Sequence, residues 1–446
     1  MIDLRAFVAT AVASVSVAAA LAGPTSVQAG TVTVITSFPK ELTAAYKSAF
    51  EKAHPEITLE ILNKNTVAGI AYVRELPVGQ RPEVFWASAP DAFDVLARDK
   101  LLAQAASLRN PQVPEKIGAY PINDAAGLYL GQALAGYGIM YNTRYLKANK
   151  ITPPKEWHDL LEPQWFGHVG ITAPSRSGTM HLTVETILQG EGWAQGWNTL
   201  LRMAGNSSSV TERSFGVPDG VNNGQFGAGP VIDFFGLSGK YSGFPVEFVY
   251  PEQTSIVPAN IALIEGAKNS EDGRKFIAYT LSQAGQELLL LPKLSRLPVL
   301  PYSDLQGKIP QGYPDPTEIA KRSKVQFDTE LSSTRYYLVQ SLFDQTITFR
   351  LKELQAATKA IMDAERKLGA APSGPQADLL KQAKELAYRP VVDSAKAGDA
   401  SFLKTLAGNK KDATVNSAIT QLESQWNTAA RERYEQARSL AIQASK

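Results

Sequence analysis

The amino-acid sequence predicts an α/β protein built as two doubly wound lobes with a cleft between them, followed by a helical tail. Two observations lead to this prediction. Up to about Leu300, strand-like and helix-like segments alternate at spacings that favour doubly wound sheets. Beyond about Pro316 the strand-like segments stop, and apolar residues recur at helical spacing toward the C-terminus.

The first lobe is predicted from an early repeat of strand and helix. Residues 31–35 are rich in β-branched residues and predict a strand, and residues 40–54 carry apolar side chains at helical spacing before Pro55. Strands are then expected at residues 57–62 and 84–87, with helices at 66–76 and 91–98.

The second lobe is predicted because the pattern restarts after Leu134. We expect residues 136–141 to form a strand that leaves the first lobe, and the Gly136-Tyr137-Gly138 sequence to mark the crossover. Further strands are expected at 169–172, 228–233, 247–250 and 261–264, and helices at 179–188 and from 270 to about 291. The expected domains are a discontinuous first lobe, residues 30–135 and 251–315, and a second lobe, residues 136–250.

The C-terminal residues 316–446 predict an all-helical extension. Residues 327–368 contain little Gly or Pro and indicate one long helix or two nearly continuous ones. Residues 377–388 and 413–445 predict further helices.

The N-terminus has the pattern of an export signal. A basic start at residues 1–5 precedes an apolar run at residues 6–21, Pro24 and a small-residue cleavage sequence ending at Ala29. We therefore expect residues 1–29 to be a signal peptide and the mature chain to be a soluble periplasmic protein. Since the chain has no cysteine, we expect no lipid on an N-terminal cysteine and no disulfide.

Composition argues against several functional classes. The 45 Lys and Arg nearly balance the 43 Asp and Glu, so we expect no nucleic-acid partner. The four histidines lack the paired spacing of a zinc enzyme, and we expect neither a metal site nor a cofactor.

A turn between an expected strand and helix of the second lobe predicts an anion-binding loop. In Ser175-Arg176-Ser177-Gly178-Thr179, glycine allows close backbone approach, the hydroxyls donate hydrogen bonds and arginine pairs with a phosphate or carboxylate. Simple capping of the following helix by Ser or Thr is the alternative interpretation.

Other polar side chains are expected in the cleft because ligands of open α/β sheets lie beyond the carboxyl ends of the strands. Each has a structural alternative: a cap or turn for the small polar residues, core packing for the aromatic residues, and an internal ion pair or backbone contact for the charged residues and histidine. These candidates are Ser37, Asn65, Thr66, Trp86, Ser88, Tyr137, His181, Arg213 and Asp233.

Residues 31–300 resemble periplasmic solute-binding proteins of ABC transporters, in the ferric-binding-like group. The resemblance lies in residues 84–91, 175–179, 214–221 and 251–291. It implies a type II two-lobe fold and ligand delivery to an ABC transporter permease in the inner membrane by a monomeric carrier.

One segment departs from the ferric binders, which commonly hold the metal with adjacent tyrosines in the second lobe. This chain has Asp233-Phe234-Phe235 there, and its Tyr336-Tyr337 pair lies in the helical tail. Phosphoglycerate transport regulatory proteins and hexose-phosphate or phosphonate binders are more similar, which implies a phosphorylated organic anion as ligand and, for regulatory members, presentation to a membrane sensor kinase.

Three alternatives remain open from the sequence. A ferric iron carrier is the first. The second is a serine hydrolase with Ser177 as nucleophile, although the chain lacks a Gly-x-Ser-x-Gly motif there. The third is an interaction protein whose helical tail carries the function.

Overall fold

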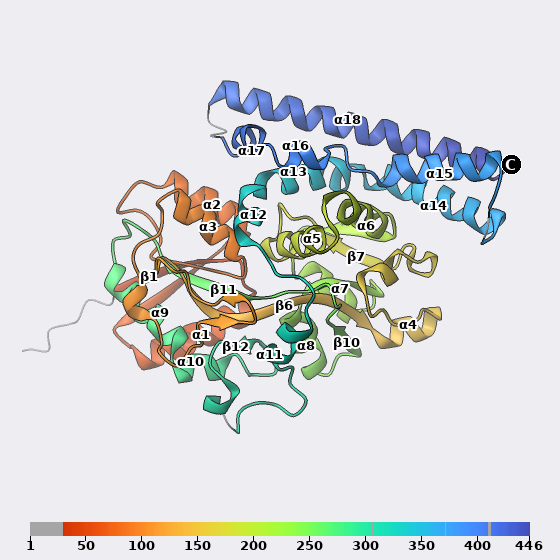
Figure 1. Ribbon diagram of the computed structural model, residues 1–446. Coiled ribbons are helices and arrows are strands. Elements are labelled where there is room, and N and C mark those ends of the chain that lie inside the picture. The colour runs from red at the N-terminus through yellow and green to blue at the C-terminus, as the bar shows by residue number, and fades with distance from the viewer. Residues whose placement is uncertain (1–29, 306, 371, 409–411) are drawn as a thin grey trace, which may run out of the picture.

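The computed structural model describes residues 30–305, 307–370, 372–408 and 412–446. The expected signal peptide lies outside these described residues. Within them, two α/β lobes lie side by side and a layer of helices crosses one side of the pair (Figure 1). No helix in the described part of the chain has the length and apolarity needed to span a membrane.

The first lobe is built on parallel strands that the sequence predicted closely. Strand β1 (Gly30–Thr36) pairs in parallel with β2 (Ile57–Asn63) on one side and β3 (Val84–Ala87) on the other, and β11 (Ile256–Leu263) adds an antiparallel strand beside β3. The covering helices are α1 (Lys40–Ala53), α2 (Thr66–Glu75), α3 (Pro90–Arg98), α9 (Ser270–Leu281) and α10 (Gln283–Leu288). The minor strands are β4 (Lys116–Ile117), β5 (Tyr120–Pro121) and β12 (Leu297–Pro298).

One long strand connects the lobes. Strand β6 (Leu130–Asn142) pairs with β11 as far as Gly136 and then with β9 (Ala228–Ile232) from Tyr137 onward. The sequence predicted only the second half of this strand. The change of partner between Gly136 and Tyr137 coincides with the expected crossover.

The second lobe continues the sheet beyond β6. Strand β7 (Val169–Thr172) lies parallel to β9 and β8 (Ser207–Thr211), while β10 (Val246–Val249) pairs with β6. Its helices are α4 (Thr143–Asn149), α5 (Gly178–Glu191), α6 (Trp193–Gly205), α7 (Gly216–Asn222) and α8 (Asp233–Tyr241).

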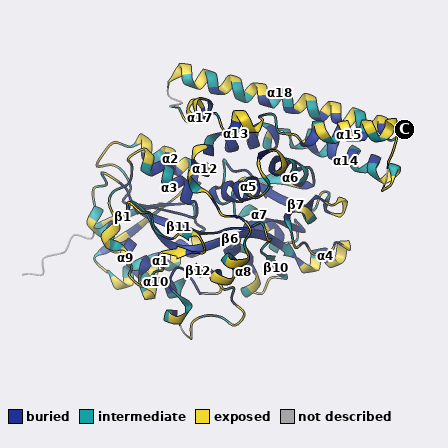
Figure 2. Ribbon diagram, viewed as in Figure 1, coloured by how far each residue is buried: buried dark blue, intermediate teal, exposed yellow. Residues whose placement is uncertain are grey.

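The C-terminal extension packs on the second lobe. Buried residues of α14 (Leu351–Leu368), α15 (Pro375–Tyr388) and α18 (Ala413–Ala444) belong to the same apolar cluster as Trp193, Trp197 and Leu200 of α6. The outer side of α18 is broadly exposed (Figure 2). The other extension helices are α11 (Pro316–Arg322), α12 (Thr329–Thr334), α13 (Tyr336–Thr346), α16 (Ser394–Ala397) and α17 (Ala400–Leu406).

Three predicted elements need correction. Residues 327–368 form three helices, because the chain leaves helical geometry around Arg335 and again at Ile347–Arg350. The helix expected from residue 270 to about 291 breaks at Ser282, which caps α10 by accepting the N–H of Gly285 at 3.2 Å. Asp233 does not end a strand: it is the first residue of α8.

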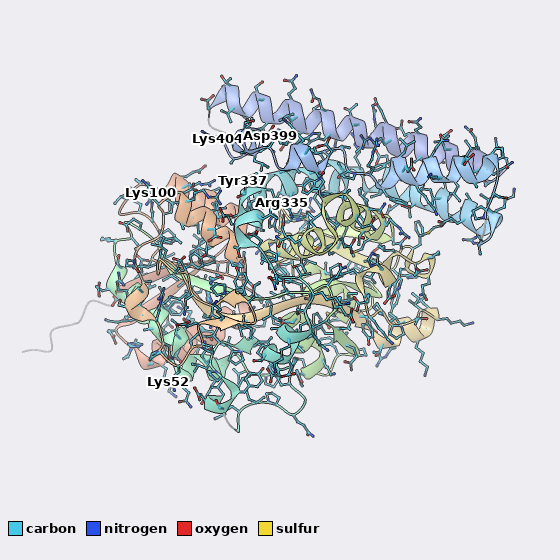
Figure 3. The ribbon with its side chains drawn as sticks, in the orientation of Figure 1. Lys52, Lys100, Arg335, Tyr337, Asp399 and Lys404 are labelled. Atoms are coloured by element: carbon cyan, nitrogen blue, oxygen red, sulfur yellow. The ribbon has the colours of Figure 1, made fainter. Side chains whose placement is uncertain are left out.

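The start of the extension also joins the two lobes. Arg98 of α3 donates to Ser333 at 2.8 Å, which ties α12 to the first lobe. Arg335 lies at the junction of α12 and α13 (Figure 3). It donates from Nε and Nη2 to the buried carboxylate of Glu185 on α5, at 2.7–3.1 Å. The extension therefore contacts both lobes.

Candidate functional site

A narrow cavity lies between the lobes, and nine of the predicted ligand contacts line it. They are Ser37, Asn65, Thr66, Ser88, Arg176, Ser177, Gly178, Thr179 and Arg213. Its other lining residues are Phe38, Pro39, Ser214, Phe234 and Phe235, which were not among the predicted contacts. Phe38 and Pro39 follow the first strand directly, and Phe234 and Phe235 lie in the segment that the sequence analysis contrasted with the ferric binders. Their positions in the sequence were therefore the available signal.

Five helices begin at this cavity because each follows a strand whose carboxyl end faces the cleft. They are α1, α2 and α3 from the first lobe, and α5 and α8 from the second. The N-terminus of a helix presents free N–H groups and a partial positive charge. Their convergence favours a negatively charged ligand.

Side chains cap only two of these five helices. The Asn65 carbonyl oxygen accepts the N–H of Ala68 at 2.8 Å, and Ser177 Oγ accepts that of Met180 at 3.0 Å. The starts of α1, α3 and α8 have no bond from an N-cap side chain, but the buried carboxylates of Asp91 and Asp233 lie in the first turns of α3 and α8, and Asp91 accepts the N–H of Ala92 at 2.9 Å. Ser177 caps α5, as the structural interpretation of the loop expected, and its hydroxyl proton is still able to donate to a ligand.

Two arginines add full positive charge. Arg176 Nη1 lies 3.1 Å from Glu212, whose side chain is largely exposed. Arg213 donates from Nη2 to Asn63 across the cleft at 2.8 Å. Among the described residues, none that lines the cavity carries a carboxylate, a phenol or an imidazole.

The lobes approach each other closely at Gly178. A Cβ at this position would lie 2.7 Å from Thr66 Oγ1 and 2.9 Å from Ala89 Cβ in the first lobe. Nearby, the buried hydroxyl of Ser88 has no hydrogen-bond partner among the described residues. The cavity therefore contains an open donor beside a close approach of the two lobes.

The other five predicted contacts do not line the cavity. Trp86 is core: its Nε1 donates to Gln132 at 3.2 Å, and its ring packs on Phe38 and Tyr46. Tyr137 is fully buried at the crossover. Ser175 instead lines a second cavity against the extension.

His181 faces a buried junction. Its Nε2 lies 3.1 Å from Asp91 of α3 and 3.3 Å from Ser332 of α12, and Ser332 donates directly to Asp91 at 2.8 Å. All three side chains are fully buried, so this junction joins the two lobes and the extension. The hydrolase hypothesis finds no support, because the His181 imidazole bonds to Asp91 and Ser332, while Ser177 Oγ accepts the N–H of Met180.

Asp233 lies behind the cavity, beneath Phe234. Its Oδ2 accepts the N–H of Gly136 at 2.7 Å and the hydroxyl of Tyr250 at 3.0 Å. Burial raises the pKa of this carboxyl to about 7. An ion pair within the protein was one alternative for Asp233, with Arg176 or Arg213 as the partner, but the arginine whose charge acts on Asp233 is Arg296.

The sequence and the fold were compared with known proteins. Residues 80–314 match the family model of bacterial extracellular solute-binding proteins. The phosphoglycerate transport regulatory protein PgtC of Salmonella typhimurium is 29% identical over 333 residues, which cover 75% of this chain and 81% of PgtC.

Solved structures share the fold at low sequence identity. The periplasmic binding protein AfuA of Actinobacillus pleuropneumoniae, bound to fructose 6-phosphate, has a TM-score of 0.58 at 17% identity, covering 73% of this chain and 96% of AfuA. Iron-bound HitA of Pseudomonas aeruginosa has a TM-score of 0.56 at 16% identity, covering 70% and 98%. The fold is thus that of type II periplasmic binding proteins, extended by C-terminal helices, and the chain belongs to the bacterial extracellular solute-binding protein family.

Proposed function

We propose that this protein captures a small anionic, phosphorylated organic solute in the cavity between its lobes. The observation that supports this best is the convergence of five helix N-termini with Arg176 and Arg213 on a cavity whose described lining has no acidic side chain. A phosphate group uses both features, since it accepts several N–H bonds and pairs with guanidinium.

Strand pairing supports a hinge between the lobes. We place the boundaries at residues 30–135 and 251–315 for the first lobe and 136–250 for the second, since β6 changes partner between Gly136 and Tyr137. A ligand that contacts both lobes favours the closed form by the difference in its affinity for the two forms. We propose that the closed, loaded form is recognised in the periplasm by an ABC transporter permease, with a membrane sensor kinase as an alternative receiver.

Ferric iron is the second candidate because iron-bound HitA shares the fold. Iron prefers oxygen ligands from carboxylates and phenols, whereas this cavity presents two arginines. The chemistry of the lining therefore favours an anion over a ferric ion.

The test is calorimetric titration of the mature chain and its variants with phosphorylated solutes. Replacing Arg176 and Arg213 together by Gln is expected to weaken binding more than tenfold, because each bond to a charged group is worth roughly 1.5–3 kcal/mol. Arg431→Gln, on the exposed side of α18, is the matched control and should bind normally. Unchanged affinity in the double variant would contradict the proposal.

A further inference from the structure

Helix α12 of the extension lies between α3 of the first lobe and α5 of the second (Figure 1). Ser332 Oγ donates to Asp91 of α3 at 2.8 Å and lies 3.3 Å from Nε2 of His181 on α5. The same His181 nitrogen lies 3.1 Å from Asp91. All three side chains are fully buried, so the two lobes and the extension meet at a point from which solvent is excluded.

Bonds on either side of Ser332 tie α12 to both lobes. Arg98 of α3 donates from Nη2 to Ser333 Oγ at 2.8 Å. Toward the other lobe, Arg335 donates from Nε to Glu185 of α5 at 2.8 Å. Two consecutive serines thus bond to the first lobe, while the end of α12 is fixed to the second.

The second lobe carries α12. The next helix, α13, contributes Leu338, Val339 and Leu342 to the apolar cluster that contains Trp193 and Trp197 of the second lobe. Because α13 follows α12 after a single residue, α12 moves with the second lobe when the lobes separate. The bonds from α12 and α5 to α3 are therefore the ones that separation must break.

This junction also lies close to the ligand cavity. Asp91 and His181 are in the first turns of α3 and α5, and both helices begin at the cavity. Rotation about β6 moves these two N-termini apart, so Asp91 must leave Ser332 and His181. A buried carboxylate that loses its hydrogen-bond partners is destabilised. Separation of the lobes therefore costs free energy whether or not a ligand is bound.

Building on the hinge of the proposed function, we propose that α12 is a latch: Ser332 and Ser333 hold α3 against the second lobe, so that the closed arrangement predominates before a ligand binds. The cavity is then formed in advance, and the ligand does not have to supply the free energy that closes the lobes. This role differs from that of a tail that only covers the second lobe, because it depends on two hydroxyl groups rather than on apolar packing.

The test measures the separation of the lobes by single-molecule energy transfer in residues 30–446. Glu60→Cys and Ser208→Cys place one dye each at exposed positions of β2 and β8, the first and last strands of the sheet order. The chain has no cysteine of its own, so the dyes attach only there. With the latch intact, we expect one main population without ligand, whose distance changes little when 3-phosphoglycerate or glucose 6-phosphate is added.

Ser332→Ala together with Ser333→Ala removes the two hydroxyl groups of the latch. In the ligand-free protein the ratio of open to closed molecules should rise at least about tenfold, the effect of losing one hydrogen bond to a charged group. Ser424→Ala with Ser439→Ala, at two exposed positions of α18, is the matched control and should keep the wild-type ratio. If the Ser332 and Ser333 variant does not fold, Arg98→Gln removes the bond to Ser333 from an exposed position and should also raise the ratio.

A ligand-free wild type that is mainly open and closes with either phosphorylated solute would overturn the latch while supporting the proposed function. A closed wild type whose ratio is unchanged by the double serine variant or by Arg98→Gln would also overturn it. A closed wild type that binds neither solute in calorimetric titration would instead contradict the proposed function.

Discussion

Gly178→Ala should impair ligand binding by obstructing closure of the lobes. The new methyl group would lie 2.9 Å from Ala89 Cβ and 2.7 Å from Thr66 Oγ1. Thr66 can rotate away, but Ala89 cannot. Since carbon atoms pack at about 3.5–4.0 Å, the lobes must separate by roughly 0.6 Å or more at this point.

That separation falls where α5 meets the cavity, so it lengthens the hydrogen bonds that a bound anion receives from the opposite lobe. Loss of one such charged bond costs roughly 1.5–3 kcal/mol, or about 10- to 150-fold in affinity. Titration calorimetry measures the affinity. Thermal unfolding of the free protein should change little, because Ala is tolerated at the first position of a helix.

Gly398→Ala is the matched control, since its Cβ would meet only ordinary contacts at 3.6 and 3.7 Å. If the Gly178→Ala variant binds the ligand with wild-type affinity, the close approach of Gly178 to Thr66 and Ala89 does not contribute to ligand binding.

Three further predictions concern stability. Glu185→Gln should lower the free energy of unfolding, measured in urea, by roughly 3–5 kcal/mol, because it leaves Arg335 without its counterion. Adding Arg335→Met to this variant should recover much of the lost stability. A loss below about 1 kcal/mol in the single variant would contradict the importance of this ion pair. Burial raises the pKa of Asp233 to about 7. Between about pH 4 and pH 7 the folded chain therefore retains a proton on Asp233 that the unfolded chain releases. The contribution of Asp233 to the free energy of unfolding falls over this range by roughly 4 kcal/mol. Asp233→Asn should flatten this decline of stability with pH. A variant whose free energy of unfolding depends on pH as in the wild type would contradict the role of Asp233. Deleting residues 369–446 should yield misfolded protein because α15 and α18 cover the apolar side of the second lobe; a folded truncation with unchanged melting temperature would show the extension to be dispensable.

Local sequence patterns predicted most of the first lobe and the position of the proposed anion-binding loop. Strands and helices there follow short-range apolar periodicity, and the residues after each strand reach the cleft because parallel strands end at the same edge. Ser37, Asn65, Ser88 and the 176–179 segment were found this way.

Long-range packing determined what the sequence did not reveal. His181 was a candidate ligand contact, with a structural role as the alternative; in the structure it contacts Asp91 and Ser332, which are distant in the chain, away from the cavity. Arg296 gave no local signal, since its position under Phe38 and Phe234 depends on the return of the chain to the first lobe. The extension was predicted as helical, but local patterns do not show that its helices pack into the same apolar core as the second lobe.

Thermal unfolding of residues 30–446 in the presence of each of a panel of solutes tests most directly whether the cleft binds a phosphorylated anion. The panel contains phosphoglycerates, hexose phosphates, phosphonates, dicarboxylates and ferric citrate. A ligand at a hundred times its dissociation constant stabilises the folded state by about 2.7 kcal/mol. We predict a higher melting temperature with phosphorylated solutes; a rise with ferric citrate alone would contradict the anion-binding cleft.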